Sequence, residues 1–145
     1  GVQIKDILTK SISIRLFNKR EQKHFWHPIF FKGQTWPTEK PFELIIQASK
    51  DGQNIFEIII GETKMKRDFD VIYVDGLPKL SEFQNEEEIL KWDKESLKII
   101  LNNSCKIGED CLKLYFSITN ESLLCVTCLD IKGKELGQFN LGNIF

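Results

Sequence analysis

The side chains in this 145-residue chain best suited to chemistry are four cysteines and two histidines. Cys125 and Cys128 form a Cys-x-x-Cys pair, a spacing used for thiol redox chemistry at a helix N-terminus or for zinc binding on a turn. The surrounding residues alternate as in a strand, so this pair points to opposite faces and shares neither a metal ion nor a disulfide. Cys105 and Cys111 lie on a predicted loop, where they can meet each other or join Cys125 or Cys128 around zinc. We expect the cysteines to act as small hydrophobic residues. A structural zinc module is kept as an alternative reading of the chain.

The two histidines also lack the neighbours that catalysis requires. His24 and His27 flank an aromatic pair, with no acidic third ligand nearby and no recognisable serine or cysteine nucleophile motif. The chain has no glycine-rich phosphate loop. The acidic run at 86–88 is typical of a solvated helix start rather than of paired catalytic acids. We therefore expect no catalytic residue, no metal site and no cofactor in this chain, which predicts a protein that is not an enzyme.

Composition narrows the class of protein further. The chain is 41% hydrophobic and 28% charged, as in an ordinary globular domain with one core. Its net charge of −1 creates no field that would attract nucleic acid or an anionic membrane. No apolar run approaches the roughly 20 residues of a membrane-spanning helix, and Lys5, Asp6 and Lys10 interrupt any signal-peptide core. We expect a cytoplasmic protein in a reduced setting, with neither nucleic acid nor membrane as a partner.

The elements that must position any site are mostly strands. Residues 112–119 alternate apolar and polar side chains with period two, and a turn at 120–122 leads to a second strand at 123–130. Pro28 predicts an edge position, a bulge or a late start for its strand. Residues 81–96 read as a helix, although their apolar stripe is imperfect. The other predicted strands lie at 11–17, 25–32, 43–48, 54–61, 70–74, 97–101 (or a continuation of the helix) and 136–144. The pattern predicts a mainly β fold, an antiparallel β-sandwich of about eight strands with one short inserted helical segment.

Three stretches in this order resemble a known family. Residues 2–17 are similar to an apolar linker, an acidic residue and a first sandwich strand. Residues 28–62 contain Thr-Trp-Pro-Thr, which looks like the family's T-x-I-P-T, then a strand, an Asp-Gly-Gln turn, a second strand and a terminal Gly-Glu. Leu77-Pro78 and residues 112–135 follow, ending in DIKGKE, which looks like D-K-x-T-G-K. The chain thus resembles the β-sandwich substrate-binding domain of DnaK-type chaperones, the seventy-kilodalton heat-shock proteins.

The resemblance implies a domain organisation and a function. Residues 1–8 would be a remnant of the interdomain linker, and residues 9–145 a single β-sandwich substrate-binding domain with an insertion at about 79–108. That insertion replaces the family's proline-rich run, and the ATPase domain and helical lid are absent from this chain. The implied function is binding of extended hydrophobic polypeptide segments. The implied partners are unfolded or extended polypeptide clients, co-chaperones and an upstream ATPase domain that would hold ATP.

The resemblance also nominates residues. Ile14 matches a pocket residue, Phe17 a residue that arches over the peptide, and Leu123 a pocket-lining position, while Asp6 matches an acidic residue that couples the two domains. The 42–56 hairpin should supply the other wall, but its register is ambiguous by about two residues, and a slip of one exchanges the faces. From that hairpin we nominate Leu44, Ile46, Ile55 and Phe56. Each apolar nominee is equally an ordinary sandwich-core residue.

A dense group of aromatic residues between positions 25 and 36, here called the aromatic patch, supports an alternative to the peptide-binding function. Adjacent Phe30 and Phe31 cannot both face inward on a regular strand. An exposed aromatic side chain would contact client peptide or a partner domain. The alternative function is a partner-docking β-sandwich that kept the fold but lost the peptide channel. An open channel would also permit self-association through the tail around Phe145. The aromatic patch comprises Phe25, Trp26, Phe30, Phe31 and Trp36.

Overall fold

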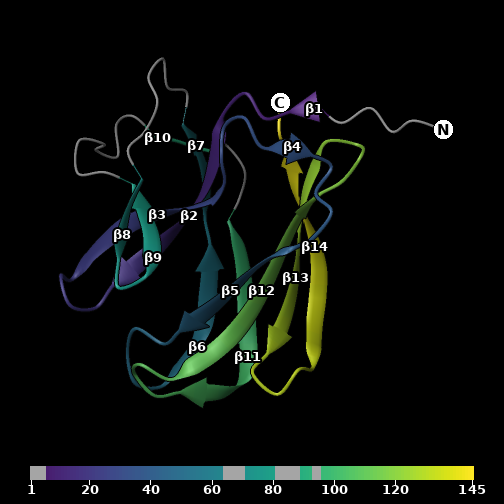
Figure 1. Ribbon diagram of the computed structural model, residues 1–145. Helices are drawn as coiled ribbons and strands as arrows, with labels where there is room; N and C mark the ends of the chain where they lie inside the picture. The colour runs from purple at the N-terminus through teal and green to yellow at the C-terminus, as the bar shows by residue number, and fades with distance from the viewer. Residues whose placement is uncertain (1–5, 64–70, 81–88, 93–95) are drawn as a thin grey trace. The chain divides into compact units, whose positions relative to one another are not determined.

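The computed structural model describes residues 6–63, 71–80, 89–92 and 96–145 (Figure 1). These residues form strands β1 to β14 and contain no helix. The predicted mainly β fold with antiparallel sheets is confirmed, with more strands than the roughly eight expected. By their contacts the described residues fall into two compact units that alternate along the chain. The first unit holds Asp6 with residues 35–56 and 98–145, and the second holds residues 7–34 and 57–97.

The first unit is built on a four-stranded antiparallel sheet in the order β14-β13-β12-β5. Its strands are β5 (Phe42–Gln47), β12 (Asp110–Ile118), β13 (Leu123–Asp130) and β14 (Glu135–Asn143). Leu114 lies between Leu44 on β5 and Cys128 on β13. All three are buried, because the strands present their apolar residues to one face with period two. The same face buries Leu112, Phe116, Val126, Leu124 and Ile118.

Two further strands belong mostly to the first unit, where β6 (Gln53–Ile58) pairs with β11 (Leu97–Cys105). Two strands of two residues each are β1 (Asp6–Ile7) and β4 (Thr35–Trp36), of which Asp6 and β4 belong to the first unit. The β5–β6 turn is the predicted Asp-Gly turn, in which Gly52 has a φ of 78° that favours glycine. The Gly52 N–H donates to the Cys105 carbonyl at 2.9 Å, which fixes how β6 and β11 align.

The second unit is built on a sheet in the order β10-β7-β2-β3. Its strands are β2 (Ser11–Asn18), β3 (Lys23–Phe30), β7 (Ile60–Thr63) and β10 (Ile89–Lys91). A hairpin of β8 (Val71–Val74) and β9 (Leu77–Leu80) belongs to the same unit. β3 is an edge strand, and its register with β2 shifts between Ile12 and Ser13, next to Pro28. Of the three alternatives that the sequence left open for Pro28, the edge position and the bulge are confirmed, and the late strand start is wrong because β3 begins at Lys23.

The predicted helical segment is not seen in the described residues. Residues 81–88 and 93–95 of the expected helix lie outside them. Ile89–Lys91 form β10, which pairs antiparallel with β7, and Leu97–Cys105 form strand β11. The imperfect apolar stripe at 81–96 gave the weakest of the sequence signals, and pairing with β7 decides the local structure at 89–91. Within the part of the chain described here, no helix has the length and apolarity needed to cross a bilayer.

Candidate peptide-binding site

Ile14 and Phe17, the two nominees on β2, lie on opposite faces of their sheet. Ile14 is 1% exposed and stands between His27 on β3 and Ile60 on β7. Phe17 is half-buried near the end of the strand, and its ring meets that of His24 edge-on at 5.2 Å. The register between the two is regular, so three positions reverse the direction of the side chain. Of these two nominees, Phe17 is therefore the one that offers apolar surface at the loop end of the hairpin.

The loop beside Phe17 is short and held by its own hydrogen bonds. The Asn18 Oδ1 accepts from the backbone N–H of Arg20 at 2.9 Å and of Glu21 at 3.1 Å. Such a bond from an asparagine to the following backbone stabilises a turn, and Gln22 completes it with a φ of 55°. The β2–β3 turn thus gives Phe17 a defined edge.

The hairpin nominees in the first unit are now placed by register. Leu44 and Ile46 face the same side of their sheet as Leu114, with Leu44 buried and Ile46 half-buried. Phe56 on β6 is also buried, at 4% exposure. Ile55 is 51% exposed on the other face of β6. Leu44 and Phe56 are therefore core residues of the first unit, Ile46 is half-buried on the same face as Leu44, and Ile55 is exposed.

The two remaining nominees are not brought together with these. Leu124 shares the buried face with Leu114, so Leu123, one position earlier on β13, belongs to the opposite face. It is half-buried there, opposite Asn143 on β14. Asp6 is exposed on β1. The structure thus places Leu44 and Phe56 in the core, leaves Ile46 and Leu123 half-buried, and exposes Asp6.

The aromatic patch is mostly buried. Trp26, Phe30 and Trp36 are at most 9% exposed, while Phe25 and Phe31 are half-buried. Phe30, the last residue of β3, is buried, whereas Phe31, which follows the end of the strand, is half-buried. The edge of Trp36 is met by the C-terminal Phe145, with ring centroids 5.7 Å apart, and Phe145 itself is 74% exposed. Self-association through the Phe145 tail stays a prediction.

The four cysteines divide into a disulfide and two thiols. Cys105 and Cys111 are joined, so for this pair the expected role as small hydrophobic residues is wrong and the alternative in which the two meet each other holds. Disulfides persist mainly in oxidising compartments, so this pairing counts against the expected reduced setting. Cys125 and Cys128 are free and face opposite sides of β13, as predicted. Burial raises the pKa of both thiols, and that of Cys128 to about 11. No cluster of three or more metal-binding side chains occurs among the residues described.

One polar cluster ties the second unit together. The Glu62 carboxylate on β7 accepts from the Lys10 ammonium at 2.6 Å and from the Trp92 indole N–H at 2.9 Å. The side chains of Lys10 and Glu62 are only 13% and 12% exposed. This cluster joins the chain before β2 to the residue after β10, so its role is structural.

Two hydroxyls on the same sheet remain without partners. Ser13 Oγ and Thr63 Oγ1 are buried and make no hydrogen bond in the described structure. β7 places Thr63 opposite Ser11, so both orphan hydroxyls lie on one face of the sheet. A buried hydroxyl without a partner costs about 1–3 kcal/mol.

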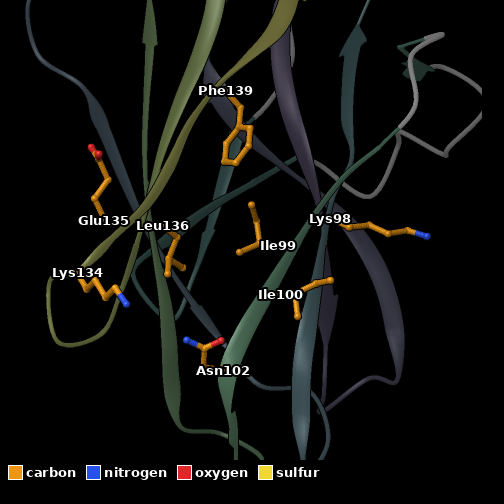
Figure 2. A pocket seen from close by; sticks show the side chains of 8 residues that line it. All are labelled: Lys98, Ile99, Ile100, Asn102, Lys134, Glu135, Leu136 and Phe139. Carbon is orange, nitrogen blue, oxygen red and sulfur yellow. The ribbon is translucent and has the colours of Figure 1, made fainter.

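A hollow of about 290 Å³ in the first unit was not anticipated from the sequence. It lies between β11 and the start of β14, with Ile99, Leu136 and Phe139 as its apolar wall (Figure 2). The ring of Phe139 folds back over Gly137, where a Cβ would stand 2.7 Å from its Cζ. Because glycine has no Cβ, residue 137 leaves room for the Phe139 ring. The sequence predicted only an apolar strand, or a continuation of the helix, at 97–101 and gave no signal for a hollow, since the neighbouring strands decide whether one exists.

No family model and no curated protein matches this chain.

Proposed function

We propose that this chain binds extended hydrophobic polypeptide segments, as the substrate-binding β-sandwich of a DnaK-like chaperone does. The observation that carries the proposal is Phe17, a half-buried aromatic beside the ordered β2–β3 turn. It occupies the position at which the resemblance places the residue that arches over the peptide. Backbone hydrogen bonds and alternate side chains make extended peptides suitable ligands for such strand ends.

The proposal includes the partners that the resemblance implies. An upstream ATPase domain would bind ATP and control affinity through the linker, with Asp6 coupling the two, and co-chaperones would act on that domain. The chain itself would perform no catalysis. A cytoplasmic location is also part of the proposal, although the Cys105–Cys111 disulfide counts against it. A pair found reduced in cells would support that location, and a persistent disulfide would refute it.

The test is fluorescence anisotropy with a labelled, leucine-rich heptapeptide. Phe17→Ala should weaken binding at least tenfold, while Phe31→Ala, which truncates another half-buried aromatic of the same unit, should leave it within about threefold. Ile14→Asp is unsuitable because it would bury a charge at a 1%-exposed position. Absence of saturable binding by the folded chain, or equal effects of the two variants, would refute the proposal.

The docking alternative has one observation in its favour. Several isoleucines of the first unit are exposed, among them Ile55 at 51% and Ile100 at 67%, although the aromatic patch is largely buried. Scattered exposed aliphatic residues are common on protein surfaces, so this support is weaker. A folded chain that fails to bind the heptapeptide but captures a fixed partner, with loss of capture in Ile100→Lys, would favour docking.

A further inference from the structure

The hollow between β11 and β14 lies where two strands each have one unpaired edge. In the described residues β11 is hydrogen-bonded only to β6, and β14 only to β13. Side chains from both faces of β11 line the hollow, Ile99 from the buried face and Ile100 and Asn102 from the exposed face. Side chains of both faces reach one hollow only at the edge of a strand. The edge of β11 is therefore open at this point.

We propose that the open edge of β11 accepts an extended peptide as an added strand, with apolar side chains in the hollow and an acidic side chain at its mouth. A strand added beside β11 directs alternate side chains to its two faces. Those on the inner face would meet Ile99, Leu136 and Phe139. Those on the outer face would lie beside Ile100, whose side chain is 67% exposed.

Charge selects the chemistry of the peptide. Two lysines line the hollow, and neither Lys98 nor Lys134 forms an ion pair in the described part of the chain. In Figure 2 the Lys134 side chain extends toward the side of Asn102, whereas Lys98 points away from the hollow. The Glu135 carboxylate also points away and accepts a hydrogen bond from Gln138 Nε2 at 3.1 Å. An acidic residue flanking the apolar positions of the peptide therefore complements Lys134.

The register identifies the backbone groups that would pair. The Cys105 carbonyl accepts from Gly52 and so points toward β6. In an antiparallel pair the backbone groups of successive residues point to alternate edges of the strand. The N–H and C=O groups of Leu101 and Ile99 therefore also point toward β6, and those of Ile100 and Asn102 point to the open edge. Proline at 102 would remove an N–H that β6 does not use, which edge strands tolerate.

This inference does not rest on the chaperone proposal, since none of its residues was nominated there. The probe is a labelled nonapeptide of alternating valine and threonine with glutamate at both ends. Asn102→Pro should weaken its binding at least tenfold, and the matched Asn102→Ala, which keeps the N–H, should bind within about threefold of the parent. Lys134→Glu should weaken this peptide and strengthen one with lysine at both ends.

A second measurement keeps the inference testable whatever the variants do. Two versions of the nonapeptide are N-methylated, one at the residues whose N–H groups point to one edge of the strand and the other at the residues of the opposite edge. Each version keeps the N–H donors of one edge. Both should bind if the peptide adds to β11 alone, while methylation of both edges should abolish binding. Retained binding of the doubly methylated peptide, or equal binding by folded Asn102→Pro and Asn102→Ala, would overturn the inference. Phe17→Ala should leave nonapeptide binding unchanged, which separates this result from that of the heptapeptide.

Discussion

The ion pair between Lys10 and Glu62 provides a quantitative test of what holds the second unit together. The two charged atoms are 2.6 Å apart on side chains that are about nine-tenths buried. At an effective dielectric constant of 20 their attraction is about 6 kcal/mol, and desolvation offsets most of it at several kcal/mol per ion. We therefore expect a coupling free energy of about 1–2 kcal/mol, above the range typical of exposed pairs.

A double-mutant cycle measures this coupling. Glu62→Gln should lower the free energy of unfolding by about 2–3 kcal/mol, because it leaves the Lys10 ammonium buried without a countercharge. Lys10→Met should cost less, since Glu62 keeps its hydrogen bond from Trp92. The double variant should be more stable than the sum of the two losses implies, by the coupling energy. Urea unfolding with an unchanged m value provides the readout.

The exposed pair Arg20 and Asp75 is the matched control. Its atoms are 3.8 Å apart and its side chains are 86% and 75% exposed. The cycle of Arg20→Gln with Asp75→Asn should give a coupling within about 0.5 kcal/mol of zero. If the Lys10–Glu62 cycle gave an equally small value, the argument from burial would be refuted.

Three further predictions concern other buried groups. Burial lowers the pKa of His27 below its ordinary value of 6.5. As the pH falls through this range the unfolded chain binds more protons than the folded chain, so the free energy of unfolding decreases. His27→Gln should flatten this dependence, measured by urea unfolding between pH 7.5 and 5. Thr63→Val should raise the free energy of unfolding by about 1 kcal/mol, because it removes an unpartnered hydroxyl, and a loss would contradict that assignment. Alkylation of the unfolded, unreduced chain should modify two thiols by mass, and four after reduction; native Cys128 should resist labelling at neutral pH, since its pKa is about 11, and prompt labelling would contradict its burial.

The elements best predicted from the sequence are those whose alternation is strict. Residues 112–130 read as a hairpin, and β12 and β13 pair as such, with Leu114 and Cys128 buried together. Pro28 likewise indicated an edge position or a bulge, because a proline has no N–H to donate to a neighbouring strand. Local chemistry sufficed in these cases.

The candidate site was harder to predict because register depends on distant strands. Ile45 is as apolar as Leu44, and Ile55 as apolar as its neighbour Phe56, so composition cannot say which of each pair turns inward. Pairing with β12 and β11 decides it. The adjacent leucines at 123 and 124 pose the same ambiguity, and the structure buries Leu124. The hollow beside β11 could not be predicted from the sequence, since it depends on which strands pair, and among the described residues β11 pairs with β6 alone.

The interleaving of the two units has a consequence for biosynthesis. Leu44 pairs with Leu114, and the Thr38 Oγ1 accepts from the Ile118 N–H across 80 residues of sequence. At about 5–20 residues per second, a ribosome needs about 4–16 s to make those 80 residues. During that interval β5 and β6 emerge without their partners, and their apolar side chains remain open to other nascent chains. The first unit can close only after β12 is synthesised, so we expect its folding to be late and sensitive to the rate of translation.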